Sequence, residues 1–472
     1  MKPLLALLGC TVVIVWLFLL NRNRKARTSW ALLIPLFWLL IAGSRNVGEW
    51  LQMGAPGEGD AYTEGNALDR NLLMGVIAVG VIALYQRRDK VGRVLQANWP
   101  ILLYFTYCLI SLSWSEYPFV GLKRWIRALG DVVMVLIVLT DRDWLNARRR
   151  LYAWAGFLLV PTSILLIRHY PQLGRAYGTS DGKAYWTGVA TGKNELGMIC
   201  MIVGLAAASR LIDIYRRREQ GPRTKLLIAH GTLLAMVAWL IHMADSATSL
   251  ACLLLGSGVL ILTSWRPLIR RPVLVHMLVL AMLFVSFSAL FLNLGSGLVQ
   301  NLGRDSTLTG RTDLWAHIFK LVDNPMFGAG YESFWIGTRL EKMRDFANGV
   351  NQAHNGYLEV YLNLGWVGVT LLAIVILTGY RNVIAAFKRH PDPSRLRLAY
   401  FVIALAYNFT EGAFKFRSPV WISFLLATMA VPSFTSVYRK ARAVASTDEM
   451  NRSDDELLFS PSIQPSIHKE FA

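Results

Sequence analysis

The chain has 472 residues, of which 54% are hydrophobic and only 17% are charged, and its net charge is +19. A charged fraction this low excludes an ordinary soluble globular protein. The positive charge does not indicate a nucleic-acid partner, because Lys and Arg collect in the short cytoplasmic loops of membrane proteins.

The apolar residues gather into runs of about 17 to 22 residues, the length that crosses a hydrocarbon core. These runs predict an all-α, polytopic transmembrane helix bundle of twelve or thirteen spans. The first run lacks the preceding basic cluster and the cleavage site of a signal peptide, so we interpret it as a span. The predicted spans are 3–20, 29–43, 71–85, 99–113, 126–140, 151–168, 194–212, 226–242, 248–264, 273–294, 356–379, 398–411 and 419–437.

Loop charge predicts the orientation of the bundle. Every second short loop is rich in Lys and Arg, and the positive-inside rule places these loops in the cytoplasm. The long loop at 295–355 then faces outward, into the periplasm of a Gram-negative cell or onto the cell surface otherwise. We predict a bacterial inner-membrane protein with a membrane domain at 1–445, and a Ser-rich, disordered cytoplasmic tail at 446–472.

The long outward loop interrupts the pattern of spans. Its residues from Arg311 to Val322 have helical periodicity, and Pro325 ends the predicted helix. One face of this helix is apolar and partly aromatic, which is typical of a helix at a membrane surface. The loop ends at His354, directly before the next span.

Basic residues are unusually frequent on the outward side. A cation at a span end commonly extends toward lipid phosphates, which is the simplest interpretation of each one. As a set on the disfavoured side of the membrane they indicate an anionic partner, such as the diphosphate of a lipid carrier. They are Lys123, Arg124, Arg127, Arg175, Lys183, Lys193, Arg311, Lys415 and Arg417.

His354 is the candidate general base. A histidine here could simply border the helix, but a neutral imidazole near pH 7 can also accept the proton of a sugar hydroxyl. Asn355 and Glu359 are four residues apart on one helical face, and they could orient His354 or bind the acceptor.

Two acidic patterns suggest a metal instead. Asp141 and Asp143 form a D-x-D sequence, and Asp60, Glu64 and Asp69 lie in the first outward loop. Neither pattern has a context that fixes a site, since the first lies in a short inner loop without a nucleotide-binding domain. We therefore predict no metal and no cofactor.

Several motifs together resemble the O-antigen ligase superfamily, which includes O-antigen and exopolysaccharide polymerases. They cover roughly residues 110 to 380. The strongest are GRTDLW at 310–315, NPMFGAG at 324–330 and HNGYLE at 354–359 followed by Leu364-Gly365; weaker ones are Ser113-Trp114-Ser115 with Pro118, and GKNELG at 192–197.

The resemblance implies a metal-independent, inverting glycosyltransferase. Its donor would be a glycan on undecaprenyl diphosphate, and its acceptor a sugar hydroxyl of a glycan or a lipid-linked molecule at the periplasmic face of the bilayer. It implies that His354 is the catalytic base, that Arg311 engages the diphosphate, and that Arg175 or Lys193, with Lys123 or Arg124, contact the lipid phosphates. Other polysaccharide assembly proteins are further candidate partners.

The GKNELG form favours an exopolysaccharide or O-antigen polymerase over a ligase that transfers glycan to lipid A-core. A flippase for the same lipid-linked sugar is an alternative of another class, but it would favour charges buried in the middle of spans. A glycosyltransferase that uses a metal and a monophosphate lipid is a third hypothesis.

Overall fold

A computed structural model describes residues 3–22, 28–51, 66–177, 182, 184–217, 223–265, 271–291, 309–346 and 351–432. Contacts divide the chain into two units, Met1–Ala430 and Val431–Ala472. Everything below concerns the first unit. The predicted domain end at 445 and the predicted tail at 446–472 lie outside the described residues.

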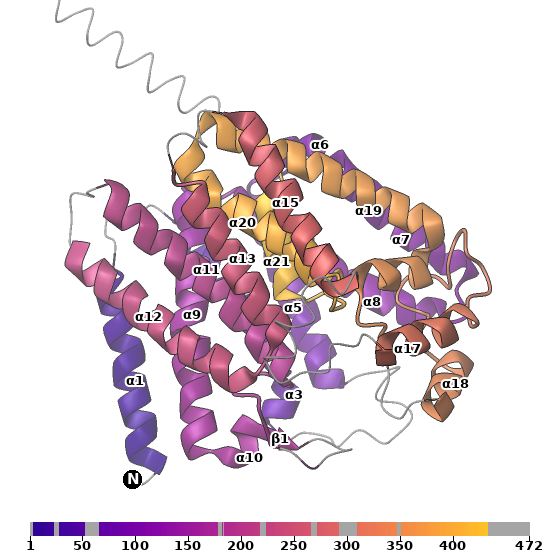
Figure 1. The fold of residues 1–472 in the computed structure, drawn as a ribbon, viewed down its shortest axis with the longest axis horizontal. Helices are drawn as coiled ribbons and strands as arrows, with labels where there is room; N and C mark the ends of the chain where they lie inside the picture. Colours follow the sequence, from indigo (N-terminus) through magenta and orange to yellow (C-terminus); the bar gives the residue numbers. More distant parts are fainter. Residues whose placement is uncertain are drawn as a thin grey trace, which may run out of the picture. The chain divides into compact units, whose positions relative to one another are not determined.

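The described residues confirm the predicted all-α fold, with one two-stranded antiparallel sheet besides the helices (Figure 1). The α-helices are α1 (Pro3–Leu20), α2 (Leu33–Ala42), α3 (Val47–Trp50), α5 (Ala67–Tyr85), α6 (Arg88–Ala97), α7 (Trp99–Ile110), α8 (Pro118–Leu139), α9 (Trp144–His169), α10 (Pro171–Gly174), α11 (Lys193–Arg217), α12 (Arg223–Ala244), α13 (Ala247–Leu262), α15 (Pro272–Phe291), α17 (Thr309–Phe319), α18 (Thr338–Phe346), α19 (Gly356–Arg389), α20 (Pro391–Tyr407) and α21 (Pro419–Thr428). Short 3-10 helices are η1 (Trp30–Leu32) and η2 (Ser111–Trp114), and the strands are β1 (Arg175–Tyr177) and β2 (Ala184–Trp186).

Each predicted span coincides with a helix, although the lengths differ. Six described helices are long and apolar enough to cross a bilayer, and a bent pair, Arg88–Ala97 with Trp99–Trp114, makes up to seven. Four shorter helices are apolar, while α8 and α20 carry more charge. The protein is therefore a multi-pass membrane protein, and the number of spans, twelve or thirteen, stays a prediction.

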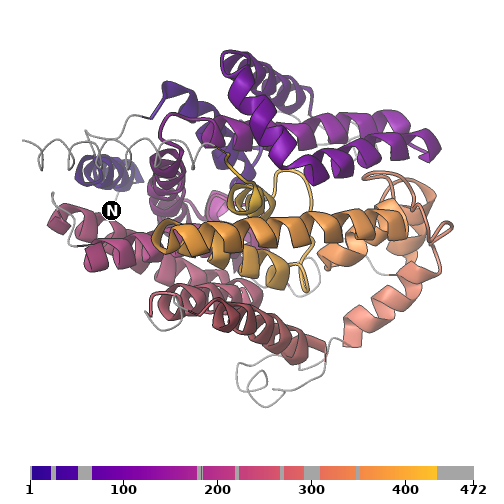
Figure 2. The same ribbon diagram turned by 90° about the horizontal axis from the view of Figure 1, so that it is seen from above.

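Burial separates the inner helices from the outer ones. Every residue of α21 is buried, and α20 packs on it, on α13 and on α19. Figure 2 shows α21, in yellow, between the purple N-terminal helices and the orange α19. In contrast, α1 and α15 expose large apolar side chains such as Val12 (67%) and Leu280 (66%). These outer faces are suited to lipid, because their side chains are apolar and the backbone groups of a helix already form hydrogen bonds within it.

α19 is broken at Gly365, where φ is +62° and ψ is −165°. The NPMFGAG segment covers the break: Trp366 N and Val367 N donate to Pro325 O and Met326 O, at 3.0 and 3.2 Å. A Cβ at Gly365 would lie 2.2 Å from Met326 O. Backbone groups freed by a helix break at membrane depth need such partners, because lipid supplies none.

The Ser-Trp-Ser segment completes this scaffold. Ser115 Oγ donates to Ser333 Oγ at 2.7 Å, and Tyr331 N donates to Ser111 Oγ at 3.0 Å. Two segments more than 200 residues apart, 111–115 and 331–333, are thus joined next to the broken helix.

The helix predicted at Arg311–Val322 is present as α17, which ends three residues earlier, at Phe319. Part of its apolar face is buried on protein, because Leu314 and Ile318 pack with Phe334, Trp335, Met343, Ala353 and Leu362. Phe319, on the same face, is 50% exposed, so protein covers only part of this face, and its place at the membrane surface stays a prediction. The loop provides its own apolar cluster, including α18, which the sequence did not predict.

Candidate functional site

His354 lies at the junction between the loop at 295–355 and α19. Its Nδ1 is 3.6 Å from Glu411 Oε2, and its side chain is 34% exposed. Asn194 Nδ2 donates to Glu411 Oε1 at 3.1 Å. The carboxylate thus lies between the imidazole and an amide that holds it. His354 is thus placed as a base, Glu411 as the acid that orients it, and Asn194 as the group that holds the acid. Enzymes use the same arrangement of a base and an orienting group to activate a nucleophile.

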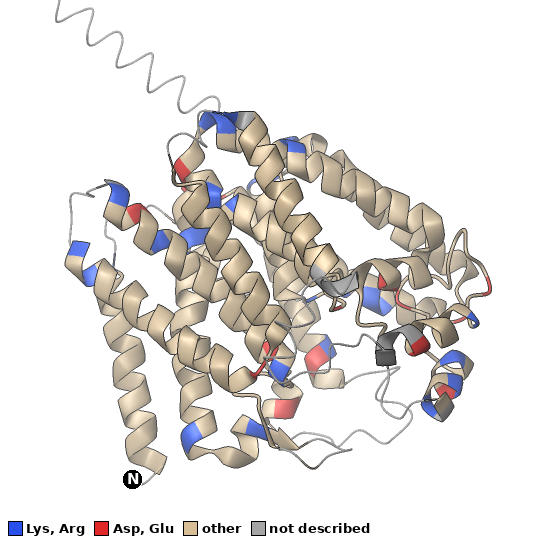
Figure 3. Ribbon diagram, in the orientation of Figure 1, with Lys and Arg blue, Asp and Glu red and all other residues tan. Residues whose placement is uncertain are grey.

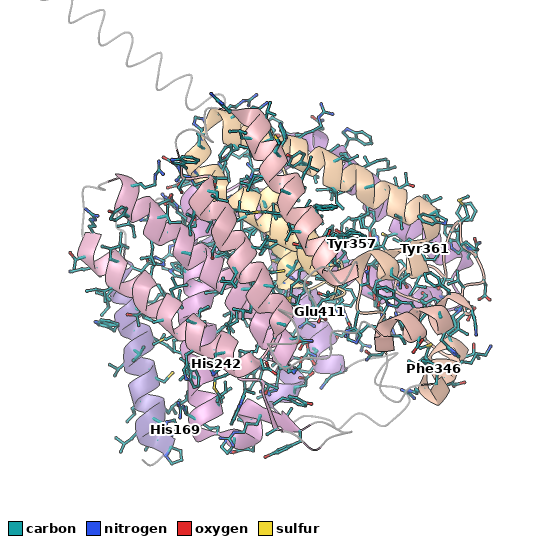
Figure 4. All side chains as sticks on the ribbon, in the orientation of Figure 1. His169, His242, Phe346, Tyr357, Tyr361 and Glu411 are labelled. Carbon is teal, nitrogen blue, oxygen red and sulfur yellow. The ribbon has the colours of Figure 1, made fainter. Side chains whose placement is uncertain are left out.

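The backbone around His354 is tightly fixed. Asn355 caps α19, its Oδ1 accepting from Tyr357 N and Leu358 N, and its Nδ2 donates to Phe409 O at 3.1 Å. Gly356 N donates to Asn408 O at 2.9 Å. These bonds tie His354 to the segment that carries Glu411, which Figure 4 labels near Tyr357.

Glu359 is one turn into α19, and its carboxylate is also engaged. It accepts hydrogen bonds from Trp335 Nε1, at 2.8 Å, and from Ala353 N. The side chains predicted to orient His354 or bind the acceptor, Asn355 and Glu359, therefore both anchor the backbone next to His354.

A cavity of about 280 Å³ lies beside this junction. Arg124 and Lys415 line it, together with Glu195, Glu332 and Gln352. Arg124 Nη1 donates to the carbonyl oxygen of Glu332. Burial raises the pKa of the Glu332 carboxyl, while the nearby charges of Arg124 and Lys415 act in the opposite direction. The cavity is large enough for a substrate group, and its lining combines two cations with the three carboxyl groups of Glu195, Glu332 and Glu359.

The predicted cations take different places. Lys123 is half-buried on α8, beside Arg124. Lys193 begins α11, with Nζ 3.7 Å from Asp245 Oδ2 and 4.9 Å from the Tyr185 ring centre.

Arg175 lies in β1, with its guanidinium 4.2 Å from the Trp186 ring centre and outside the lining of the cavity. The structure therefore brings Arg124 to the cavity and places Lys193 next to Asn194, whereas Arg175 lies against Trp186.

The side chain of Arg311 lies outside the described residues, and only its place on α17 is known. Trp315 Nε1 donates to Ala353 O at 2.9 Å, and Ala353 directly precedes His354. The helix that carries Arg311 is thus fastened next to the candidate base.

Sequence reasoning missed Glu411 and its contact with Asn194. Asn194 lies in the GKNELG motif, and Glu411 is an acidic residue at the end of an outward loop that is otherwise basic. No sequence spacing links residues 194, 354 and 411, so only the packing of α11, α19 and α20 could bring them together.

The acidic patterns have structural roles where they are described. Asp141 accepts from Ser29 N and Asp143 N, both at 3.1 Å, and Asp69 accepts from Gly48 N at 2.9 Å. Asp60 and Glu64 lie outside the described residues. Among the residues that are described, no group of three His, Cys, Asp or Glu side chains is placed to hold a metal ion.

The fold and site define a multi-pass membrane protein in which His354 and Glu411 lie beside a polar cavity that Arg124 and Lys415 line. A family model described as O-antigen ligase matches residues 231–373. The chain is also 26% identical over 313 residues to the exopolysaccharide production protein ExoQ of Rhizobium meliloti (strain 1021), a match that covers 63% of this chain and 68% of that protein. These matches confirm the predicted resemblance to the O-antigen ligase and polymerase superfamily.

Proposed function

We propose that this protein transfers a glycan from undecaprenyl diphosphate to a sugar hydroxyl at the periplasmic face of the inner membrane. The observation that carries the proposal is the placement of His354, with Nδ1 toward Glu411 and a cavity containing Arg124 and Lys415 beside it. A carboxylate on the Nδ1 side leaves Nε2 to accept a proton. Cations in the cavity suit the charge that develops on a leaving diphosphate.

In the proposed step, the acceptor oxygen forms a bond to the anomeric carbon of the donor. The bond between that carbon and the diphosphate oxygen breaks, its electron pair leaves with the diphosphate, and the hydroxyl proton passes to His354 Nε2. Attack on the face opposite the leaving group inverts the anomeric centre. Arg311, Arg124 and Lys193 contribute positive charge, and no metal or cofactor takes part.

We propose a polymerase that lengthens an exopolysaccharide or O-antigen chain. The match to a protein named for exopolysaccharide production supports this choice. The alternative is a ligase that transfers glycan to lipid A-core, which the family description supports. Incubating the purified protein with lipid-linked glycan and either acceptor distinguishes them: longer lipid-linked chains support a polymerase, and glycosylated lipid A-core supports a ligase.

The first prediction concerns His354 and Arg311. His354→Ala and Arg311→Ala should each reduce glycan transfer by about 10²-fold or more, since a general base and an oxyanion-stabilising group each contribute that much. Transfer is measured in detergent with added EDTA, so a sealed compartment and a free divalent ion are both absent. Product formed under these conditions is not expected of a flippase.

Matched controls are His242→Ala and Arg344→Ala, which remove exposed side chains from α12 and α18. These variants should retain full transfer. Normal product from both His354→Ala and Arg311→Ala would contradict the proposed chemistry, and loss of activity in EDTA would contradict its metal independence.

A further inference from the structure

A second polar cavity lies between α9, α11, α12 and the start of α20, with a volume of about 60 Å³. One water needs about 10–15 Å³ of such space, so the cavity has room for a group of a few heavy atoms. Four arginines and two aspartates line it: Arg148, Arg149, Arg150, Arg210, Asp213 and Asp392.

This cavity is distant from the His354 site. Leu396 of α20 lines it, whereas Asn408, directly after α20, contacts Gly356 beside His354. The twelve residues between them correspond to a rise of roughly 18 Å. Figure 3 shows Lys and Arg gathered where α11 ends and α12 begins, the end that loop charge predicts to be cytoplasmic.

Two buried side chains in the cavity have unused hydrogen-bonding atoms. Arg148 is 4% exposed, and although its Nη2 donates to Pro393 O at 2.8 Å, its Nε and Nη1 have no partner. His230 is also 4% exposed; its Nε2 contacts Asn21 Oδ1 at 3.2 Å, and its Nδ1 has no partner. A buried polar atom without a hydrogen-bond partner is costly, and a water, an ion or a ligand can supply the missing bond.

The aspartates do not supply those partners because other cations already hold them. Asp213 Oδ2 accepts from Arg149 Nη2 at 2.7 Å, and Asp213 Oδ1 lies 3.9 Å from Arg395 Nη1. Asp392 pairs with Arg395, which is not among the lining residues. The cavity therefore retains more positive than negative charge, and the unused atoms of Arg148 are donors.

We propose that this cavity binds a phosphate group, either the headgroup phosphate of an anionic phospholipid or a soluble phosphate. Guanidinium groups suit phosphate oxygens because they present several donors in a fixed plane. Basic pockets between helices on the cytoplasmic side are suited to anionic headgroups. This site is separate from the proposed glycan transfer, and its test does not depend on that activity.

The test measures thermal unfolding of the full-length protein. One arm adds inorganic phosphate to protein in neutral detergent, at constant ionic strength set with chloride. The other compares phosphatidylcholine nanodiscs with and without phosphatidylglycerol. A ligand that binds only the folded chain raises its stability with concentration. The variants are Arg148→Gln and His230→Phe, the latter preserving ring volume should the former fail to fold. The matched control is Arg142→Gln, which removes an exposed arginine from the same end.

We expect the wild-type protein and Arg142→Gln to be stabilised in at least one arm. Arg148→Gln should weaken the apparent Kd about tenfold or more, and His230→Phe should weaken it too. Stabilisation by phosphatidylglycerol alone identifies a lipid headgroup, and stabilisation by inorganic phosphate identifies a soluble source. No stabilisation in either arm, or an equal response in Arg142→Gln and the cavity variants, would overturn the proposal.

Discussion

At the scale of single residues, Glu411 is proposed to position the imidazole of His354. Its carboxylate is 3.6 Å from Nδ1, and Asn194 holds the other oxygen. Glu411→Gln keeps the shape and removes the charge. We expect the kcat of glycan transfer to fall about tenfold to hundredfold, less than for the base itself, with little change in donor KM.

A merely structural role for Glu411 would give a different pattern. Residues that act as a unit have non-additive effects, so adding Glu411→Gln to His354→Ala should cause no further loss of transfer. Glu341→Gln, an exposed glutamate of α18, is the control. A full additional loss in the double variant, or a raised KM at constant kcat, would contradict the positioning role.

Glu332 gives a prediction about pH. Its pKa is raised by burial, so the folded chain binds this proton more tightly than the unfolded chain. This contribution favours folding at low pH and is lost as the pH rises above the ordinary value near 4.5 toward the raised pKa. Glu332→Gln has no titrating carboxyl at this position, so it lacks this pH-dependent contribution to stability. The unfolding temperature of the variant minus that of the wild type should therefore rise with pH, while the difference for Glu341→Gln stays flat.

At the scale of elements, the break in α19 is the feature on which the outward loop is built. Gly365 has φ +62°, and a Cβ there would meet Met326 O at 2.2 Å. Gly365→Ala forces the NPMFGAG segment away from the break, which leaves Trp366 N and Val367 N without their acceptors. We expect a loss of more than about 3 kcal/mol of stability, from backbone strain and unpaired polar groups together.

Gly75→Ala is the control for this prediction, because nothing lies within 4 Å of a Cβ at Gly75 on α5. It should unfold within a few degrees of the wild type in a thermal scan in detergent, whereas Gly365→Ala should unfold far lower. Equal unfolding temperatures would show that the break does not depend on a glycine.

Elements with a strong local signal were predictable from the sequence. The apolar runs, and the Gly and Pro residues between them, predicted where the helices lie, because a membrane span requires a length and composition that few other elements need. The break at Gly365 was hidden, since its partners lie in NPMFGAG, some 40 residues earlier. The cluster that buries Leu314 and Ile318 of α17 was also hidden, because periodicity shows which face is apolar and not what covers it.

The candidate site was predictable only in part, because some of its residues come together only through the packing of helices that are distant in the sequence. His354 stands out by its type and its place at a span end. Glu411 and Asn194 become meaningful only when α11, α19 and α20 pack together. Asn355 is the N-cap of α19 and its Oδ1 accepts from the helix backbone, while the carboxylate of Glu359 accepts from Ala353 N and Trp335 Nε1.

At the scale of the whole molecule, two polar regions lie at opposite ends of α20. One contains His354 and the cavity with Arg124, and the other contains the arginine cavity around Arg148. Because α20 and α21 are buried between them, the two ends are joined by a packed core of helices. The loop charges predict that these ends face different sides of the membrane.

This orientation can be measured with single-cysteine variants. Cys108, Cys200 and Cys252 are buried, so replacing the half-buried Cys10 with Ser gives a background with little labelling. Glu341→Cys on the outward loop should react with a membrane-impermeant maleimide in intact cells whose outer envelope has been made permeable. Arg142→Cys, in the short loop between α8 and the arginine-rich start of α9, should react only after the inner membrane is opened, because basic loops are retained in the cytoplasm. Labelling of Arg142→Cys alone in intact cells would invert the orientation and with it the periplasmic placement of His354.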